Sequence, residues 1–476
     1  MDEERLKKLE IIEKGGINAY PYSYDCSAYS TQILQSYEKF EGTTQKIAGR
    51  IIQKRDFGAL AFCHIQDNEG KIQAMARADD LGEQKMALFA SLDLGDIIGV
   101  EGKIGKTKKG EISLFISDFS LLSKSLRFMP DKFKGLSDTE IRYRKRHLDL
   151  IANPSVRKFF VARQKIVDSI RLFLNSRGYL EVDTPILQKI YGGAAAKPFT
   201  TMHNALDQKL YLRISNELYL KRLIIGGIDK VYEFSKDFRN EDIDSTHNPE
   251  FTQVEFYESY KDYNNYMALT QEMFAKILSE LGMGKKIIFQ GKEIDFSNFG
   301  TVSLYEDILK KSKIDILSWK DENEAYAQCV AVGVRPSTHT LSKCVDALFD
   351  HFVVPNLPGA CFVIDFPYYM CPLTKKKRGN PALAERFELF IGGYECGNCY
   401  SELTDPREQR RKLEEQAVHL RAGDEESNPL DEDFLEAMEY GMPPTAGMGI
   451  GIDRLAMIFT DNISIKEVIL FPSMKD

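Results

Sequence analysis

The stretch FRNEDIDSTHNPEFTQVEFY, residues 238–257, combines an arginine, a histidine, aromatic rings and carboxylates. Both of its ends alternate in polarity, which predicts two strands of a hairpin joined by a polar loop. Phe251, Glu255 and Tyr257 then share one face, and Arg239 joins them if the apolar faces of the two strands coincide. A guanidinium group binds phosphate or carboxylate through a planar set of donors. The stretch therefore predicts an anion-binding cleft, although an amphipathic hairpin with a surface ion pair would show the same pattern.

A second predicted hairpin, RFELFIGGYECGNCYSEL, turns at Gly392-Gly393 and carries two carboxylates, Glu388 and Glu395, diagonally on one face. Carboxylates placed in this way repel each other unless a cation lies between them, and hard oxygen ligands suit Mg²⁺ that also binds phosphates. Strict alternation puts three further polar residues on the opposite face: Asn398, Tyr400 and Glu402. A bulge near Gly397 would turn them back, and the sequence leaves this open.

The stretch PPTAGMGIGIDRLAMIF has glycines at alternate positions, 447, 449 and 451, followed by Asp453 and Arg454 at the start of a helix. Glycines spaced in this way on a strand remove side chains where another group approaches the backbone. The spacing is neither that of a P-loop nor that of a dinucleotide-binding fingerprint.

The chain that must position these residues divides into segments that differ in their predicted secondary structure. From about residue 45, five strand-length runs bounded by NEG and KKG turns predict a small Greek-key barrel of the OB type, with an SH3-like barrel or an open meander as the alternative. Later, long helices alternate with antiparallel strands, which predicts an α+β fold with helices flanking the sheet. We expect four parts: an N-terminal helix and linker (1–44), the barrel (45–125), a charged connector (126–150) and a catalytic domain (151–476).

Within the last part, the amphipathic helix that begins near Ser155 should stop at Gly178, before a short strand that ends at Pro185. Residues 285–350 should form a helical insertion, and a charged helix should lie around 405–425.

Composition narrows the class of protein. No apolar run reaches the length of a spanning helix, and the charged N-terminus is unlike a signal peptide, so we expect a cytoplasmic protein that binds neither membrane nor DNA. The net charge is −8, yet residues 46–148 hold 19 Lys and Arg against 14 Asp and Glu, which favours a polyanion bound at this segment. Eight scattered cysteines should be reduced, and the single CxxC, Cys396 and Cys399, favours core residues over a metal or redox site.

Taken together, the motifs resemble a known family. GYLEVDTPIL, FRNE…HNPEFTQVEFY and GMGIGIDRLAMIF look like motifs 1, 2 and 3 of class II aminoacyl-tRNA synthetases, at about 161–187, 230–257 and 443–459. NELYLKRL, ERFELFIGG and SELTDP are similar to class II lysyl-tRNA synthetases in particular. The resemblance implies ATP-dependent attachment of L-lysine to tRNA(Lys) through a lysyl-adenylate, with Mg²⁺ as cofactor and a homodimer formed through motif 1.

The resemblance also implies roles for individual residues. Arg239 and Arg454 would be catalytic. The ATP-binding set would be Arg239, Glu241, His247, Asn248, Phe251, Glu388, Glu395, Gly451 and Arg454. The lysine-binding set would be Gly193, Glu217, Arg239, Glu255, Tyr257, Asn398, Tyr400 and Glu402. The Mg²⁺ ligands would be Glu388 and Glu395. The anticodon-binding set would be Phe62, Gln73 and Arg55.

Three positions depart from the family pattern: Tyr191 replaces a proline, Cys399 replaces a glycine, and Lys54 stands where an arginine often contacts the anticodon. Phe62 could also be an ordinary core residue, since strand aromatics are usually buried. Rival functions are a synthetase for aspartate or asparagine, an enzyme that transfers lysyl-adenylate to a protein, and a catalytically silent RNA-binding scaffold. Acidic residues at the predicted amino-acid site favour lysine, because buried carboxylates require a positive partner.

Overall fold

The computed structural model describes residues 1–129, 136–421 and 427–475. The chain forms two compact units, Met1–Leu136 and Ser137–Asp476. The middle of the predicted connector, residues 130–135, lies outside the described residues, as does the end of the helix predicted around 405–425. The connector's two described helices belong to the second unit.

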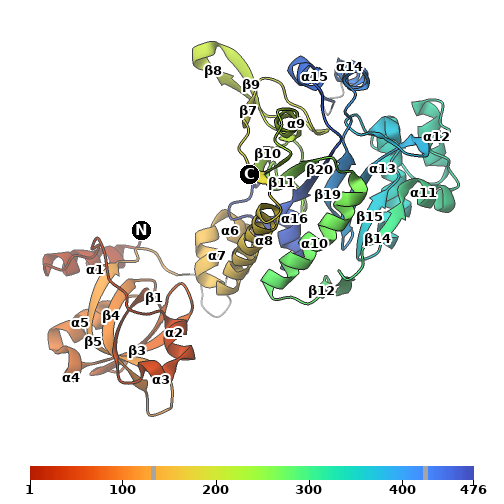
Figure 1. The fold of residues 1–476 in the computed structure, drawn as a ribbon. Coiled ribbons are helices and arrows are strands. Elements are labelled where there is room, and N and C mark those ends of the chain that lie inside the picture. The colour runs from red at the N-terminus through yellow and green to blue at the C-terminus, as the bar shows by residue number, and fades with distance from the viewer. Residues whose placement is uncertain (130–135, 422–426, 476) are drawn as a thin grey trace. The chain divides into compact units, whose positions relative to one another are not determined.

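The first unit is built on a closed five-stranded barrel with the order β1-β2-β3-β5-β4 (Figure 1). This closure confirms the OB-type barrel and excludes an open meander. Two short helices, α4 and α5, separate β3 from β4, and α1 to α3 precede the barrel. The bounds are α1 Glu3–Lys14, α2 Ser30–Gln35, α3 Tyr37–Phe40, β1 Thr44–Asp56, β2 Leu60–Gln66, β3 Lys71–Arg77, α4 Ala78–Leu81, α5 Glu83–Ser91, β4 Ile97–Lys106 and β5 Ile112–Ser123.

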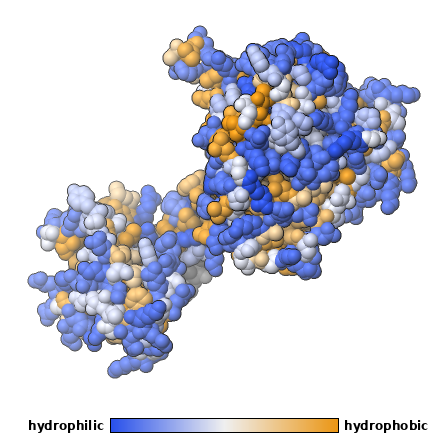
Figure 2. Space-filling model, viewed as in Figure 1, coloured by the Kyte–Doolittle hydropathy of each residue, from blue (hydrophilic) through white to orange (hydrophobic). Residues whose placement is uncertain are grey.

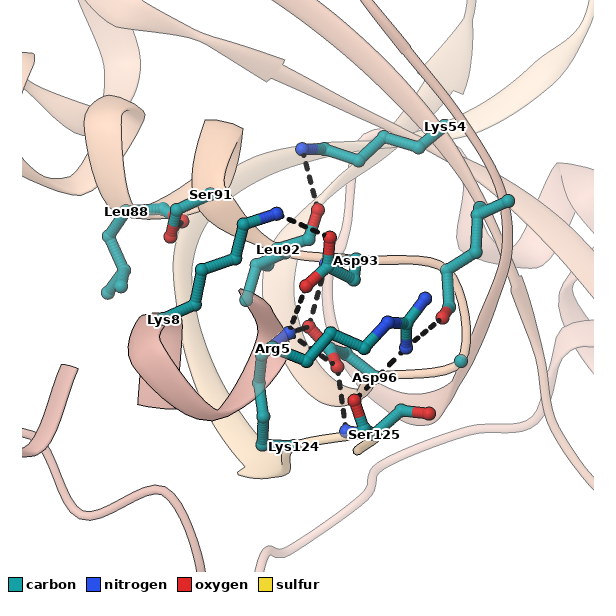
Figure 3. A network of polar contacts seen from close by, with 12 residues as sticks. Arg5, Lys8, Lys54, Leu88, Ser91, Leu92, Asp93, Asp96, Lys124 and Ser125 are labelled. Atoms are coloured by element: carbon teal, nitrogen blue, oxygen red, sulfur yellow. Dashed lines mark hydrogen bonds and ion pairs between the residues drawn. The ribbon is translucent and has the colours of Figure 1, made fainter. Parts of the chain in front are cut away.

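Alternating side chains explain the barrel. Along β2, Ala61, Cys63 and Ile65 are fully buried while the residues between them are partly exposed. A polar network closes one end of the unit (Figure 3): Lys124 Nζ, without exposure to solvent, lies 2.6 Å from Asp93 Oδ2 and 2.8 Å from Asp96 Oδ2. Such a buried charge is tolerated because two acidic side chains lie close to it.

The second unit contains an eight-stranded sheet with the order β14-β15-β18-β19-β20-β11-β10-β6. Its pairs are antiparallel except β14 with β15 and β6 with β10, which agrees with the predicted α+β class. The strands of this sheet are β6 Leu180–Glu181, β10 Lys230–Phe238, β11 Glu250–Ser259, β14 Gly300–Ser303, β15 Ala360–Ile364, β18 Arg386–Ile391, β19 Tyr394–Ser401 and β20 Thr445–Gly451. Smaller sheets contain β7 Leu187–Gln188, β8 Thr200–His203, β9 Gln208–Leu212, β12 Lys286–Phe289, β13 Lys292–Asp295, β16 Lys376–Lys377 and β17 Asn380–Ala384.

Helices cover one face of the large sheet. The core there joins apolar residues of α8, α10 and α16 to even-numbered strand residues such as Tyr232, Val254 and Phe256 (Figure 1). The opposite, polar face, which carries the odd-numbered residues of β10 and β11, is therefore left for a site. The helices of the second unit are α6 Thr139–Arg144, α7 Arg146–Ala152, α8 Arg157–Asn175, α9 Glu217–Ile225, α10 Tyr263–Leu281, α11 Leu304–Ser312, α12 Glu322–Ala331, α13 Leu341–Phe352, α14 Pro406–Arg421, α15 Glu432–Glu439, α16 Ile452–Phe459 and α17 Ile465–Val468.

Two local expectations can be compared with the structure. Helix α8 ends before Gly178, whose φ of +78° favours glycine, and the short strand β6 follows. The helical insertion expected at 285–350 contains α11, α12 and α13, but its first part is not helical: β12 and β13 form a hairpin, β14 joins the large sheet, and helix begins only at Leu304. The run KIIFQGKEID alternates about a glycine turn, so its periodicity was that of strands. No helix in the described ranges is both long and apolar enough to cross a membrane.

Candidate active site

Strands β10 and β11 bring the predicted cleft residues together. In their antiparallel register Asp237 lies opposite Phe251, and Val231 lies opposite Tyr257. Odd-numbered residues thus face the same side, as the alternation predicts. Arg239 directly follows β10, and its guanidinium carbon lies 5.0 Å from the centroid of the Phe251 ring. A cation beside an aromatic plate is the arrangement expected of an anion-binding cleft.

A β-bulge decides the position of the second set of polar residues. Phe390 pairs with Glu395, but the register then shifts, so that Glu388 pairs with Asn398 and not with Gly397. The extra residue, Cys396, restores Asn398 to the face of Glu388 and Glu395. Tyr400 and Glu402 follow at alternate positions. The bulge that the sequence left open is therefore present, and it unites the predicted metal-binding and amino-acid-binding residues on one face.

Strand β20 forms the floor between these two sets. Gly449 lies opposite both Glu255 and Asn398, and Gly447 lies opposite both Tyr257 and Tyr400. A Cβ atom added at Gly447 would lie 2.0 Å from Tyr257 Cε1 and 2.5 Å from Glu402 Oε1. The alternate glycines thus make room for the side chains that approach from both neighbouring strands.

Three carboxylates gather in this pocket. Glu217, Glu255 and Glu402 are 4%, 6% and 0% exposed. Burial, followed by the charges of Asp237 and Glu217, raises the pKa of Glu255 well above its usual value. Burial also raises the pKa of Glu402 to about 8, and Glu217 contributes to this shift. Buried anions that raise one another's pKa values form a site that a bound cation would stabilise.

Polar neighbours hold Glu255 in place. Ser215 Oγ donates to Glu255 Oε1 at 3.0 Å, Gln253 Nε2 donates to the same oxygen at 2.6 Å, and Tyr257 Oη donates to Oε2 at 3.3 Å. Gly193, with φ +88°, lies against the same group, since an added Cβ would meet Ser215 Oγ at 2.8 Å. The carboxylate is therefore oriented without a basic side chain among these hydrogen-bond donors.

Among the pocket's acceptor atoms that lack a hydrogen-bond donor within the described part of the chain are Asn398 Oδ1 and Glu402 Oε1. Both are buried, and such atoms cost free energy when no donor reaches them. Sequence reasoning missed one cation here. Lys221 Nζ lies 2.5 Å from Glu217 Oε1 and also pairs with Glu402 Oε2. The i,i+4 spacing of Glu217 and Lys221 on α9 was visible in the sequence, whereas the pairing with Glu402 was not.

Glu388 and Glu395 form the predicted metal pair. Burial, and then the charge of Glu395, raises the pKa of Glu388 to about 8. Arg386 Nη2 pairs with Glu388 Oε1 at 2.5 Å, and Asp346 on α13 adds a further negative charge that affects Glu388. Sequence reasoning did not single out Arg386 or Asp346. A cation between these two adjacent carboxylates would favour the charged form of Glu388.

The predicted nucleotide residues lie at the open end of the hairpin. Arg454 Nη1 donates to the backbone oxygen of Glu395 at 2.5 Å, and Arg454 Nη2 lies 3.1 Å from His247 Nε2. Arg454 and His247 therefore lie close to Glu395, one of the two predicted Mg²⁺ ligands. Asn248 is buried instead: its amide donates to Glu250 O at 2.6 Å and accepts from Ser473 N at 3.0 Å. Glu241 is exposed, and Gly451 ends β20 opposite Gln253.

The predicted anticodon residues lie on the outer surface of the barrel. Phe62 pairs across the strands with exposed Arg55, and Phe62 alternates with buried residues, so it is not a core residue. Gln73 Nε2 donates to Glu111 Oε2 at 2.7 Å. Lys54 points the other way, because its Nζ donates to Ala90 O at 2.6 Å. The barrel thus presents an aromatic ring, an arginine and an amide on its surface.

Two of the positions that depart from the family pattern, Tyr191 and Cys399, hold side chains that pack in the interior. Tyr191 is buried with its ring centroid 5.0 Å from that of Tyr211. Cys399 and Cys396 are free, buried thiols of the large core, which favours the predicted core role of the CxxC. Within the described ranges, no group of three or more His, Cys, Asp or Glu side chains could hold a metal ion by itself.

Comparison with known proteins places this geometry in a family. Residues 138–475 match the family of class II tRNA synthetases (D, K and N), and residues 45–122 match the OB-fold nucleic acid binding domain. Similar curated proteins include the lysine–tRNA ligase of Carboxydothermus hydrogenoformans, which is 46% identical over 99% of this chain and 97% of its own length. The lysine–tRNA ligases of Thermoanaerobacter sp. and Moorella thermoacetica are 46% and 44% identical over 99% of this chain, and 95% and 97% of their own lengths are covered.

Proposed function

The chain belongs to the class II tRNA synthetases of the D, K and N group, and from this premise we propose that it attaches L-lysine to tRNA(Lys) in protein synthesis. The second unit activates lysine with ATP to form lysyl-adenylate and then transfers the lysyl group to the tRNA. The first unit binds the anticodon. The relatives' activity and their near-complete coverage of this chain support the assignment.

The acidic pocket is the observation that carries the choice of lysine. A site for aspartate or asparagine within this family would have to pair a carboxylate or a neutral amide. Here Glu217, Glu255 and Glu402 are buried together, and the pocket's lysine, Lys221, is already paired with two of them. A ligand with two ammonium groups satisfies these carboxylates and supplies donors to Asn398 Oδ1 and Glu402 Oε1. A shorter or neutral ligand would leave buried anions without a partner, and a site discriminates most strongly against substrates that leave its buried polar groups unpaired.

The reaction needs no nucleophile from the protein. The lysine carboxylate attacks the α-phosphorus of ATP, and pyrophosphate leaves. Arg239, beside the Phe251 ring, binds the carboxylate and the α-phosphate as negative charge develops, and Phe251 stacks on the adenine. Arg454 reaches the terminal phosphate. The positions of Arg239 and Phe251 beside each other, and of Arg454 on α16 beside Glu395, support these proposed roles.

Mg²⁺ fits the pair Glu388 and Glu395. Burial and then the charge of Glu395 raise the pKa of Glu388, and a cation between the two carboxylates would relieve their repulsion. Mg²⁺ is commonly held by one or two carboxylates together with substrate phosphates, so a pair without a third protein ligand suffices. When bound, the ion would neutralise charge on the leaving pyrophosphate.

Apolar residues of the motif 1 region support a homodimer. Exposed side chains there are Val161, Leu172, Leu180, Ile186 and Leu187, at 57%, 57%, 51%, 45% and 51% exposure. Figure 2 shows orange, apolar residues on the visible face of the second unit around α7, α8 and β7. A patch of this kind is expected at a two-fold interface. Sedimentation of the purified chain would show a dimer, and a monomer at micromolar concentration would contradict this proposal.

Aminoacylation of tRNA with lysine, aspartate and asparagine, measured side by side, tests the function. We expect charging with lysine and none above background with the other two. In the same assay Arg239→Ala should abolish lysine-dependent pyrophosphate exchange. Charging with aspartate or asparagine would contradict the choice of lysine, and near-normal exchange by Arg239→Ala would contradict the role of that arginine.

A further inference from the structure

Lys221 is fully buried in a pocket that we assign to a positively charged substrate. Its Nζ lies between Glu217 Oε1, at 2.5 Å, and Glu402 Oε2. The three side chains are 0%, 5% and 0% exposed. Helix α9 supplies Glu217 and Lys221, and Glu402 comes from the chain that follows β19, so the contact joins two walls of the site.

The ammonium group remains charged in this position. Burial by itself would lower the pKa of Lys221, but Glu217 and Glu402 raise it above its usual value. A protonated lysine therefore stays between two carboxylates, out of contact with water.

Fold stability alone does not require a lysine here. The neighbouring α9 residues Leu220 and Ile224 are buried among apolar side chains, and replacing a buried ion pair by apolar groups is often neutral or stabilising. An ammonium group at this position consequently points to a role in the site.

The charges of the pocket and of lysine match only when Lys221 is included. Once a cationic substrate holds all three carboxylates in their charged form, Glu217, Glu255 and Glu402 carry three negative charges and Lys221 one positive charge, which leaves two negative charges. The lysine zwitterion carries two ammonium groups, and its carboxylate is assigned to Arg239. Without Lys221 the pocket would hold one unmatched anion.

We infer that Lys221 is a positioning residue for amino-acid specificity, which holds Glu217 and Glu402 together across two walls of the site, favours the charged form of Glu402 and orients both side chains for the ammonium groups of the substrate. This inference rests on the proposed lysine-activating function. Without Lys221, Glu402 would ionise only at a higher pH, and lysine would have to displace a proton from Glu402 in order to bind.

Three further titratable groups interact electrostatically with Glu402. They are Lys375 before β16, Tyr257 on β11 and Cys399 on β19. Lys375 lowers the pKa of Glu402 less than Lys221 does. Burial raises the pKa of Tyr257 and that of Cys399, which keeps both neutral. Lys221 is therefore the stronger of the two cations acting on Glu402.

The test compares Lys221→Met and Lys221→Arg with the wild-type full chain by lysine-dependent pyrophosphate exchange over a range of pH. In wild type the KM for lysine should reach its minimum near pH 8, where Glu402 ionises. Loss of an adjacent opposite charge shifts a carboxyl pKa by about 1–3 units. In Lys221→Met the pH of that minimum should rise by this amount, and the KM at neutral pH should rise about tenfold or more. The KM for ATP should not change.

Lys221→Arg, which keeps the charge, should retain the wild-type pH profile. Lys412→Met is the matched control, because Lys412 is another buried lysine, at 6% exposure, that donates to the backbone of Tyr368 outside the pocket. Its pH profile should equal that of wild type. Thermal melting checks that each variant folds, and Lys221→Gln replaces the methionine variant if that one does not.

A Lys221→Met profile that superimposes on wild type would overturn the inference. So would an increase in the KM for lysine that is equal at every pH, because this would indicate a merely structural role. A wild-type chain without lysine-dependent exchange would instead refute the proposed function.

Discussion

The role of the alternate glycines in the pocket can be tested by a substitution that adds a single methyl group. In Gly447→Ala the new Cβ would lie 2.0 Å from Tyr257 Cε1 and 2.5 Å from Glu402 Oε1. Tyr257 is 3% exposed and packs in a cluster with Leu220 and Val231, so its ring cannot retreat without moving those neighbours. The methyl group must therefore displace the tyrosine, the glutamate or the strand.

The magnitude follows from this crowding. Overpacking of a well-filled interior costs about 1–3 kcal/mol. Displacement of the Tyr257 ring would also break its 3.3 Å hydrogen bond to Glu255, at about 1 kcal/mol. If the combined cost of about 2–4 kcal/mol falls on the substrate-binding conformation, the KM for lysine rises about 30- to 1,000-fold. The KM for ATP should change little, because Arg239 and Phe251 lie at the other end of the hairpin.

Lysine-dependent pyrophosphate exchange measures both KM values, and thermal melting reports any general loss of stability. Gly284→Ala is the control, because the nearest atom to its added Cβ, Lys286 O, is 4.0 Å away. A lysine KM for Gly447→Ala within twofold of wild type, with unchanged melting, would refute the pocket geometry.

Three further predictions concern the barrel, the pH dependence and the buried charges. Phe62→Ala should lower kcat/KM for tRNA about 5- to 150-fold through the loss of base stacking and leave pyrophosphate exchange unchanged; an equal effect on both would contradict an anticodon role. Burial raises the pKa of Glu402 to about 8, and the ammonium group of the substrate requires the ionised carboxylate. The KM for lysine should therefore fall about tenfold per pH unit on approach to pH 8 and then level off. A flat profile below pH 8 would contradict this prediction. Lys124→Met leaves Asp96 buried and without its nearest cation, and should destabilise the first unit by about 3–5 kcal/mol in urea denaturation; a loss below 1 kcal/mol would show that the pair is not needed.

Much of the architecture depends on local pattern and could be predicted from the sequence. The barrel strands alternate strictly, as Ala61, Cys63 and Ile65 show in β2. The facing of Phe251 and Tyr257 on the hairpin also follows from period-two alternation. The two strands from 286 to 295 were missed because a short hairpin was grouped with the longer helices that follow it.

The site's remaining features depend on contacts that local pattern does not encode. A single extra residue, Cys396, reverses the facing of every later residue in β19, and nothing in its side chain marks it as a bulge. Lys221 could be matched with Glu217 four residues earlier, but its second partner, Glu402, lies far along the chain. Lys54 was a candidate for RNA contact by position, yet its ammonium group caps backbone carbonyls at the end of α5.

Binding of L-lysine and of norleucine to the wild-type chain, measured by calorimetry at pH 8, tests the central claim most directly. Norleucine has nearly the same shape but lacks the ε-ammonium group, so it leaves a buried carboxylate of the pocket without a partner. We predict that norleucine binds about 10⁴-fold more weakly than lysine. Affinities within tenfold of each other would show that the acidic pocket does not recognise the second positive charge.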